Sequence, residues 1–324
     1  MIDAAIVGLG RWGRNMVNAV QGKSERLRFV RGCVRHPEAV RDFTRQHGIE
    51  MSSDLADVLA DPKVQAVVFA TPHTLHVQQI IAAAASGKPV FCEKPLTLNR
   101  ADAERAVAAC KKAGVLLGVG HDKRFWSSMR ELKRVVASGD LGEILHVEGN
   151  SSNEVSRKFF TPWRDSPEES PGGGMTGTGI HILDAFVNLI GPVRRVQAQL
   201  LTRKPPPEVL DTVSVLVEFA NGVSGVLCGV RATPFFWRVH VFGTKGSAEA
   251  LGETELVLRM SNSKPQHLNF EPVDTLRSEL ELFADAVAGL TQYPIPTAQM
   301  IATVAAFEAV VKSMESDAPV LVGQ

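Results

Sequence analysis

Several features that would mark particular protein classes are missing from this sequence. Lys plus Arg and Asp plus Glu each number 35, so the formal net charge is zero. A general nucleic-acid binder would usually show an excess of basic residues, so this charge balance argues against that class. No long uncharged apolar run and no polybasic tail is present, so we predict no membrane span or anchor. The 324 residues, 44% hydrophobic and 22% charged, are typical of a globular protein with room for two domains.

Cysteines and metal-ligand patterns are also sparse. Cys33, Cys92 and the other two cysteines show no Cys-x-x-Cys spacing, and each sits in an apolar segment. This pattern predicts buried, reduced thiols in a cytoplasmic protein, and the opening MIDAAIVGLGRWG lacks the features of a secretory signal. His73 and His76 are close in sequence but have no cysteine or carboxylate beside them, so we predict no metal site.

Short apolar strands alternate with helical segments over the first part of the chain. The expected strands are residues 4–7, 28–34, 64–70, 90–92 and 116–120. Alternation at this short spacing predicts a doubly wound parallel sheet, an α/β Rossmann domain over residues 1–122. Ligands of such sheets bind beyond the carboxyl ends of the strands.

The first strand runs into a G-x-G-x-x-G motif at residues 8–13, with a helical pattern after it. We expect Gly8 to allow a tight turn, Gly10 to let a pyrophosphate approach the backbone, and Gly13 to let the helix pack on the strand. The motif therefore predicts a dinucleotide site, and we count Arg11 and Trp12 among its cofactor contacts.

The end of the second strand reads Val34-Arg35-His36-Pro37 and carries no carboxylate to accept the ribose hydroxyls of NAD. Arg35 is placed to meet a 2′-phosphate, and nothing acidic at this strand end repels one. We therefore predict a preference for NADP, with Arg35 and His36 as cofactor contacts. The alternative is a solvated Arg35 with NAD accepted as well.

Polar residues also follow the third expected strand. Thr71, Pro72 and His73 come directly after residue 70, and His76 begins the next helix. Since the carboxyl ends of parallel strands form the ligand-binding edge, we predict that these four residues line the cofactor site.

The fourth expected strand ends in Glu93-Lys94-Pro95, where a nicotinamide ring would reach. The proline ends the strand and fixes a turn. Lys94 can hydrogen-bond a substrate hydroxyl or carbonyl and handle its proton as hydride moves. We therefore predict Lys94 as a catalytic, cofactor-binding and substrate-binding residue, and Glu93 as a cofactor contact.

With these residues in place, the chain resembles the glucose-fructose oxidoreductase / inositol dehydrogenase / MocA family (Gfo/Idh/MocA) of NAD(P)-dependent oxidoreductases. The matching segments, in family order, are AIVGLGRWG, ATPHTLH, GKPVFCEKPL, GDLGEILHVEG, GGGMTGTGIHILDAF and VFGTKGSAE. They are specific for the family and say little about the substrate, because the family acts on many sugars, polyols and related carbonyl compounds.

The resemblance implies roles for two motifs. It makes Lys94 the usual catalytic group, preceding a proline bond that is commonly cis, and it makes His181 a second catalytic and substrate-binding residue. The family's aspartate, four residues before the histidine, falls on Gly177 here. A proton relay would then run through Lys94 and His181 or through water. Asp184, one turn later, is a candidate to orient His181, with capping or domain packing as the alternative.

After residue 122 the pattern changes to long runs of strand. The expected strands are 143–151, 193–203, 212–219, 223–230, 238–242, 247–251 and 256–260, with helices over 126–138, 175–190, 276–290 and 297–316. They predict an α+β domain over residues 123–324 with a large, mostly antiparallel open sheet. An open sheet face is a natural subunit interface, and the resemblance implies a homodimer or homotetramer formed through it.

Our predicted function is an NADP(H)-preferring oxidoreductase that moves hydride between nicotinamide and a hydroxyl or carbonyl carbon of a small polar substrate, such as a sugar or polyol. We place Arg124, Trp163 and Arg164 with the substrate. Two alternatives stay open. The arginines and aromatics of 157–164 suggest a carboxylated or aromatic-derived semialdehyde, a lactol or a dihydrodiol. The glycine at position 177 suggests a non-catalytic dinucleotide-binding sensor or regulatory protein.

Overall fold

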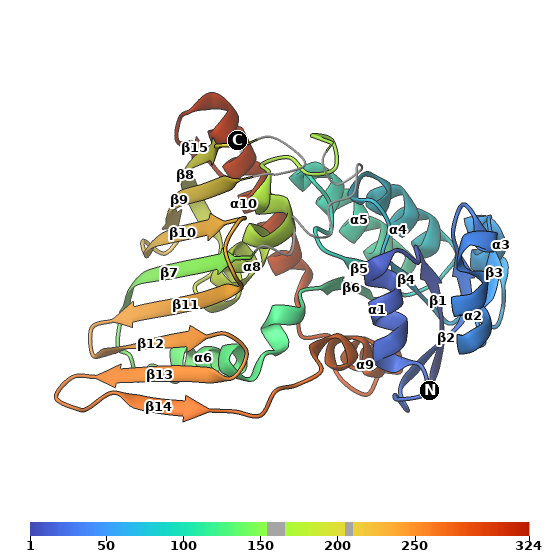
Figure 1. Ribbon diagram of the computed structural model, residues 1–324, viewed down its shortest axis with the longest axis horizontal. Helices are drawn as coiled ribbons and strands as arrows, with labels where there is room; N and C mark the ends of the chain where they lie inside the picture. The colour runs from blue at the N-terminus through green and yellow to red at the C-terminus, as the bar shows by residue number, and fades with distance from the viewer. Residues whose placement is uncertain (154–165, 205–209, 324) are drawn as a thin grey trace. The chain divides into compact units, whose positions relative to one another are not determined.

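The computed structural model describes residues 1–153, 166–204 and 210–323, and the chain divides into two compact units (Figure 1). The first unit contains Met1–Thr97, Ala101–Asp122 and Asp274–Met300, and the second contains Leu98–Arg100, Lys123–Val273 and Ile301–Gln324. The segment Asp274–Met300, which the sequence-based division assigns to the second domain, therefore packs with the first unit.

The first unit is built on a parallel six-stranded sheet with the strand order β3-β2-β1-β4-β5-β6. Its strands are β1 (Ile2–Val7), β2 (Leu27–Cys33), β3 (Glu50–Ser52), β4 (Ala66–Phe69), β5 (Val90–Glu93) and β6 (Leu117–Gly120). The order reverses between β1 and β4, and sheets of this type bind ligands at the carboxyl ends of the strands beside that reversal. The predicted doubly wound Rossmann sheet is confirmed.

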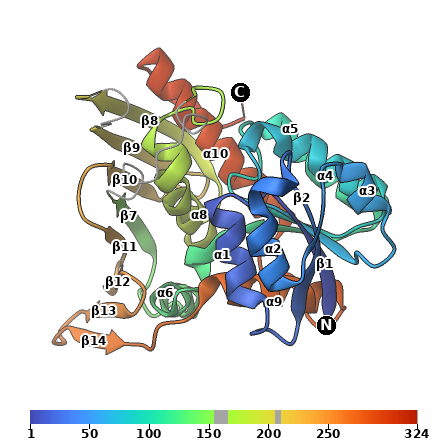
Figure 2. The same ribbon diagram turned by 45° about the vertical axis from the view of Figure 1, so that its right-hand side comes forward.

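Helices follow these strands on both faces of the sheet. They are α1 (Arg11–Val20), η1 (Pro37–Val40), α2 (Arg41–His47), α3 (Leu55–Ala60), η2 (His73–Leu75), α4 (His76–Ala85), α5 (Arg100–Ala113) and, from late in the chain, α9 (Thr275–Val287). Helices α1 and α9 lie side by side (Figure 2). Phe283 of α9 meets Phe91 of β5 edge-on, with ring centroids 5.5 Å apart, so α9 completes the core on this side.

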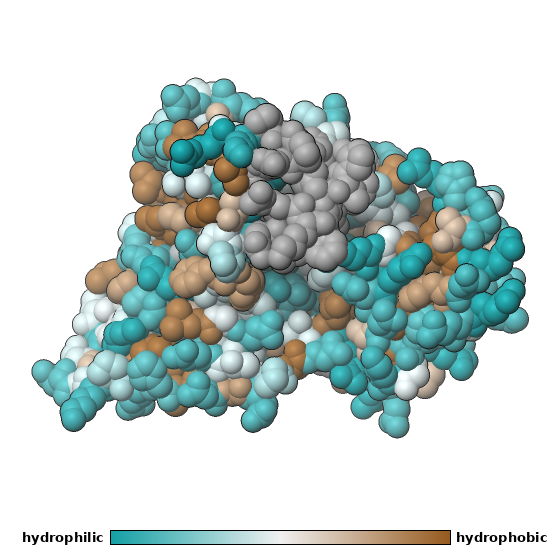
Figure 3. Space-filling view, viewed as in Figure 1, coloured by the Kyte–Doolittle hydropathy of each residue, from teal (hydrophilic) through white to brown (hydrophobic). Residues whose placement is uncertain are grey.

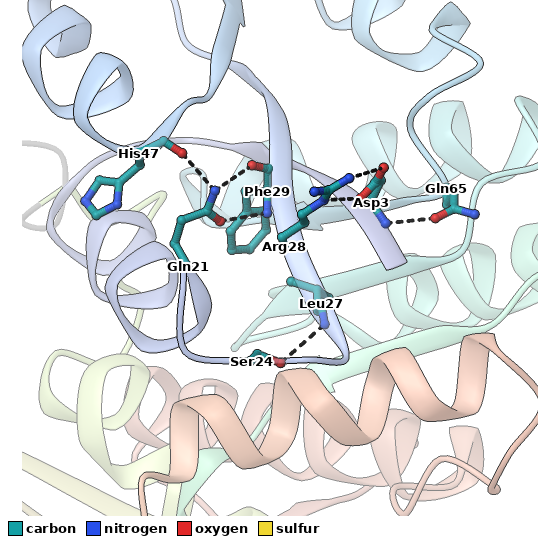
Figure 4. Close-up of polar contacts among 8 residues, drawn as sticks. All are labelled: Asp3, Gln21, Ser24, Leu27, Arg28, Phe29, His47 and Gln65. Carbon is teal, nitrogen blue, oxygen red and sulfur yellow. Dashed lines mark hydrogen bonds and ion pairs between the residues drawn. The ribbon is translucent and has the colours of Figure 1, made fainter. Parts of the chain in front are cut away.

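Side-chain amides fasten the first two strands to their neighbours (Figure 4). Gln21, just after α1, donates to the carbonyl oxygens of Phe29 and His47 at 3.0 and 2.8 Å and accepts the Phe29 N–H at 3.0 Å. On β1, the backbone N–H of Asp3 donates to the Gln65 side chain at 2.8 Å. These contacts satisfy backbone groups at the start of the sheet and fix the entry of β1 and β2.

The second unit contains a nine-stranded sheet in the order β14-β13-β12-β11-β7-β10-β9-β8-β15. Its strands are β7 (Ile144–Ser152), β8 (Val193–Thr202), β9 (Asp211–Phe219), β10 (Ser224–Val230), β11 (Phe236–Gly243), β12 (Gly246–Leu251), β13 (Glu255–Met260), β14 (Gln266–Asn269) and β15 (Val320–Leu321). Among the described residues, neighbouring strands of this sheet pair antiparallel, except β7 with β10, which are parallel. The predicted large, mostly antiparallel sheet is confirmed.

Helices cover one face of this sheet (Figure 2). The helical segments are η3 (Asp122–Phe125), α6 (Ser127–Ser138), the π-helical turn η5 (Met175–Gly179), α8 (Ile180–Leu189) and α10 (Thr297–Ser316). On β9 the residues alternate strictly, with Val213, Val215 and Val217 buried against the helices and the residues between them more exposed. Burial of one face in this way fixes the register of the strand.

The opposite face of the sheet is polar at its centre and apolar toward β8 and β9. Arg238 forms ion pairs with Glu148 and Glu249 on the two flanking strands. Leu201 and Leu216 are 53% and 58% exposed. Brown apolar residues stand among teal polar ones over this part of the molecule in Figure 3. The face thus combines cross-strand charge pairs with exposed leucines.

The sequence patterns do not anticipate the shortest elements. Strands β3, β14 and β15 and helices α2 and α3 have two to seven residues each, and they lack the continuous apolar run that marks the equally short strands β4, β5 and β6 in the sequence or are too short for a helical period to show. The helix expected over 175–190 instead begins with the π-helical turn η5 before α8.

Candidate active site

Two glycines of the first loop are required by close backbone contacts. Gly8 has a φ of +92°, and a Cβ there would lie 2.5 Å from the Ala70 carbonyl oxygen. A Cβ on Gly13 would lie 2.0 Å from the carbonyl oxygen of Gly8. The turn after β1 and the packing of α1 on it therefore exclude any larger residue at these positions.

Gly10 is different, because a Cβ added there meets nothing within 4 Å. It is the exposed N-cap of α1, with no capping side chain and no acidic residue in the first turn. The first N–H groups of a helix lack intrahelical partners and carry its positive dipole end. Open space in front of these donors fits a pyrophosphate, so the residues present suit a dinucleotide. Arg11 is exposed and Trp12 partly buried beside this opening.

The residues after β2 form an exposed corner. Arg35 and His36 are both exposed, and His36 Nδ1 lies 3.2 Å from Glu38 Oε1. Within the described residues Arg35 takes part in no ion pair. An exposed guanidinium at this strand end is available to an anionic group.

The residues after β4 are held by a side-chain contact to the following helix. Thr71, Pro72 and His73 are each half-buried, and Pro72 is the N-cap of η2. The Thr71 hydroxyl donates to Gln79 Oε1 of α4 at 2.6 Å. This bond ties the end of β4 to α4.

His76, the first residue of α4, is fully buried, with 0% of its surface exposed. Its Nδ1 lies 2.9 Å from the Pro95 carbonyl oxygen and its Nε2 lies 3.1 Å from the Thr71 carbonyl oxygen. Its ring also meets the His73 ring edge-on at 5.7 Å. His76 is predicted from the sequence as a cofactor contact, whereas both of its ring nitrogens face backbone carbonyls of the protein.

Glu93 ends β5 and is buried, with 7% exposure. Its Oε2 accepts the backbone N–H of Lys94 at 3.2 Å, and the peptide bond between Lys94 and Pro95 is cis. Gly120 faces Glu93 across the β5–β6 pair, and a Cβ there would lie 2.7 Å from Glu93 Oε1. Gly120 therefore makes room for the carboxylate. Sequence reasoning gives it no role, because only the register shows which residue it faces.

Burial raises the pKa of the Glu93 carboxyl to about 7. The Trp12 indole and the Lys94 ammonium oppose this rise, and the Asp122 carboxylate adds to it. Both Glu93 Oε1 and Trp12 Nε1 are buried and fall outside hydrogen-bond geometry with any described group. A carboxyl that is half protonated near neutral pH thus lies directly beside Lys94.

In the second unit, His181 lies on the first turn of α8 and is half-buried. Gly177 lies one turn before it within η5, is exposed, and would meet nothing within 4 Å of an added Cβ. The missing side chain therefore leaves open space. A π-helical turn inside an α-helix is frequent at functional sites.

Arg124 and Asp184 form a buried ion pair. The Arg124 guanidinium donates to both oxygens of the Asp184 carboxylate, at 2.7 and 2.6 Å, with side chains 8% and 3% exposed. The domain-packing alternative for Asp184 agrees with this ion pair, since it joins η3 to α8. A direct contact of Arg124 with substrate stays a prediction. The other predicted substrate contacts, Trp163 and Arg164, lie outside the described residues.

The first-unit residues predicted from the sequence thus lie at or after the carboxyl ends of β1, β2, β4 and β5. Across residues 1–153, 166–204 and 210–323, no group of three His, Cys, Asp or Glu side chains is arranged to hold a metal ion. Among the same residues, no helix is both long and apolar enough to cross a membrane.

Comparisons with known proteins identify the family to which both units are similar. Residues 2–121 match the GFO_IDH_MocA family model, described as an oxidoreductase family with an NAD-binding Rossmann fold, and residues 129–249 match the GFO/IDH/MocA C-terminal domain. The myo-inositol 2-dehydrogenase of Thermotoga maritima is 31% identical over 265 residues, which are 78% of this chain and 77% of the relative.

A second relative and a solved structure extend the comparison. The trans-1,2-dihydrobenzene-1,2-diol dehydrogenase of Sus scrofa is 30% identical over 225 residues, 68% of this chain and 66% of the relative. A crystal structure from Desulfitobacterium hafniense, of a protein assigned as an NADPH-dependent oxidoreductase, has a TM-score of 0.88 and 27% identity. It covers 99% of this chain and 97% of its own.

Proposed function

The chain belongs to the GFO/IDH/MocA family of oxidoreductases, and we propose that it is an NADP(H)-preferring member. It would move hydride between nicotinamide and a hydroxyl or carbonyl carbon of a small polar substrate such as a sugar or polyol. The observation that carries this proposal is the pairing, in one unit, of an open helix N-terminus at Gly10 with Lys94 at the end of β5. Family membership favours an enzyme over a non-catalytic sensor.

Each step of the proposed reaction has a residue of this chain to perform it. The bound nicotinamide supplies the hydride chemistry. The α1 N-terminus binds the pyrophosphate through N–H groups that have no partner within the helix. In the reductive direction the Lys94 ammonium donates a proton from Nζ to the oxygen that gains negative charge, and in the oxidative direction its amine accepts that proton. A catalytic role for His181, on the first turn of α8 in the second unit, stays a prediction.

The predicted role of Lys94 has a direct test. We expect Lys94→Met to fold and to bind NADPH as the wild type does, while its turnover falls by about tenfold to a thousandfold, because a positioned proton donor contributes on that order. The matched control is Lys63→Met at an exposed lysine of the same unit. Near-normal turnover of Lys94→Met would contradict the mechanism.

The NADP preference is supported by Arg35, which is exposed at the end of β2 where no carboxylate competes with a 2′-phosphate. We expect NADPH to bind at least about tenfold more tightly than NADH, since a charge-assisted contact to phosphate is worth 1.5 kcal/mol or more, roughly. Titration followed by tryptophan fluorescence measures both affinities. Arg35→Ala should weaken NADPH binding and leave NADH binding in place. Equal affinities of the wild type for NADPH and NADH would contradict the proposed NADP preference, whereas the proposal of an oxidoreductase would stand.

A second candidate keeps the enzyme class and changes the substrate to a carboxylated or aromatic-derived semialdehyde, a lactol or a dihydrodiol. The similarity to a trans-1,2-dihydrobenzene-1,2-diol dehydrogenase favours it, together with the arginines and aromatics of the sequence at 157–164. Arg157→Ala and Arg164→Ala should then raise KM for an acidic substrate far more than for a neutral one. Equal changes in both would exclude an acidic substrate.

Two further proposals concern the state of the protein in the cell. We propose that the open face of the nine-stranded sheet forms a homodimer or homotetramer, because Leu201 and Leu216 are exposed on it. Sedimentation of the wild type and of Leu216→Glu tests this, and a wild-type monomer would contradict it. The free thiols of Cys33, Cys92 and Cys110, all buried, support a cytoplasmic location.

A further inference from the structure

The contacts of His76 link the end of β4 to the residue that follows Lys94. The ring is completely buried and lies between two backbone carbonyl groups, with Nδ1 2.9 Å from the Pro95 oxygen and Nε2 3.1 Å from the Thr71 oxygen. Both partners are acceptors, so each contact is a hydrogen bond only when that ring nitrogen carries a proton. A neutral ring donates to one of them, and an imidazolium donates to both.

The backbone on both sides of Lys94 is in contact with neighbouring side chains. Its own N–H donates to Glu93 Oε2 at 3.2 Å, and the carbonyl of the next residue, Pro95, faces His76. The Thr71 end of the bridge is itself fixed, because its hydroxyl donates to Gln79 at 2.6 Å. Through the His76 ring, the turn that carries Lys94 is therefore tied to the end of β4 and to α4, which are rigid parts of the sheet and its covering helix.

We infer that His76 is a positioning residue for Lys94, acting through an Nδ1–H···O hydrogen bond to the Pro95 carbonyl. This inference rests on the proposed function, in which Lys94 handles the substrate proton. The Nδ1 contact is the shorter of the two and is the one that reaches the turn carrying Lys94. Loss of this bond frees the turn to shift. A displacement of about 1 Å at a reacting group costs about a hundredfold in rate.

Two conservative variants separate the two ring nitrogens. An asparagine amide nitrogen is as many bonds from Cβ as His Nδ1, so His76→Asn keeps a donor for Pro95. A glutamine amide nitrogen is as many bonds from Cβ as His Nε2, so His76→Gln keeps a donor for Thr71 instead. Each variant loses one of the two contacts, and we therefore expect similar falls in Tm. A merely structural role would affect both variants alike.

The expected result is a difference in kcat. His76→Asn should turn over at least about tenfold faster than His76→Gln, because only His76→Asn keeps the hydrogen bond that holds the turn carrying Lys94. Equal kcat values for the two variants, or slower turnover of His76→Asn, would overturn the inference.

A second measurement does not depend on turnover. In the absence of substrate, hydrogen–deuterium exchange of the amides of Lys94 and of residues 96–98 should be faster in His76→Gln than in His76→Asn, because only His76→Gln releases the Pro95 carbonyl. If the wild type turns over no substrate, the proposed function fails and this comparison still decides the role of His76. Equal exchange in the two variants would refute it.

Discussion

Replacing Glu93 by glutamine should remove a pH-dependent loss of stability. Burial raises the pKa of this carboxyl from an ordinary value of 4.5 to about 7. Between those values the folded chain keeps a proton that the unfolded chain has released. The stability contributed by this protonated carboxyl is therefore fully present below pH about 4.5, and it is lost as the pH rises through about 7. At about 1.4 kcal/mol for each pH unit, the interval amounts to about 3 kcal/mol.

The quantity to measure is the difference in unfolding free energy between Glu93→Gln and the wild type. We expect this difference to rise by about 3 kcal/mol in favour of the variant as the pH increases from about 4.5 to about 8. Other titrating groups are common to both proteins and cancel. Because the chain has two compact units, hydrogen exchange of the β5 amides reports the unit that contains Glu93.

The matched control is Glu271→Gln, at an exposed carboxylate, which gives the effect of removing one charge without burial. A potentiometric titration provides an independent check, since the folded wild type should release one proton more than Glu93→Gln near pH 7. A difference in stability that stays constant over the pH range would refute the reasoning. It would mean that the folded protein holds Glu93 ionised in spite of its burial.

Three further predictions follow from burial and close contact. Gly13→Ala should destabilise the protein by about 1–3 kcal/mol or more, because its Cβ would lie 2.0 Å from the Gly8 carbonyl oxygen. Gly10→Ala places a Cβ with nothing within 4 Å, so it should keep the Tm and weaken dinucleotide binding. Equal Tm values for these two variants would contradict the close backbone contact at Gly13. Arg124→Met should cost about 3–5 kcal/mol by leaving a buried carboxylate uncompensated, against about 0–1 kcal/mol for Arg105→Met in an exposed pair. Similar losses in chemical unfolding would refute that contrast. Gly177→Ala should raise stability by about 0.4–1 kcal/mol, measured as Tm, because its Cβ enters open space; a fall would show a hidden packing constraint.

The Rossmann sheet was predictable because its signals are local. The strand before Gly8, the glycine spacing and the helix after it follow one another directly in sequence, and each is confirmed in β1 and α1. The long strands of the second sheet were predictable for the same reason, since alternation along Asp211–Phe219 marks the buried face. Strand β15 and helix α2, of two and seven residues, contain too little apolar pattern to be read, unlike the short but continuous apolar runs of β4 and β5.

From the sequence, site residues can be proposed only where a residue type and its position along one strand carry the chemistry. Lys94 and Arg35 follow strand ends, and parallel strands bring their carboxyl ends to one edge. The partners of Asp184 and His76 could not be read in this way. Asp184 takes Arg124, 60 positions away, and His76 reaches Pro95, 19 positions away.

The sequence by itself therefore determined the fold class and the glycine loop between β1 and α1, and it placed Lys94 directly after β5, because periodicity and motif spacing are properties of neighbouring residues. Tertiary structure alone decided that Asp274–Met300 packs with the first unit, that Gly120 makes room for Glu93, and that His76 spans two loops. Each of these depends on strand register and helix packing between distant segments. Burial, which raises the pKa of Glu93 to about 7, exists only once those segments have come together.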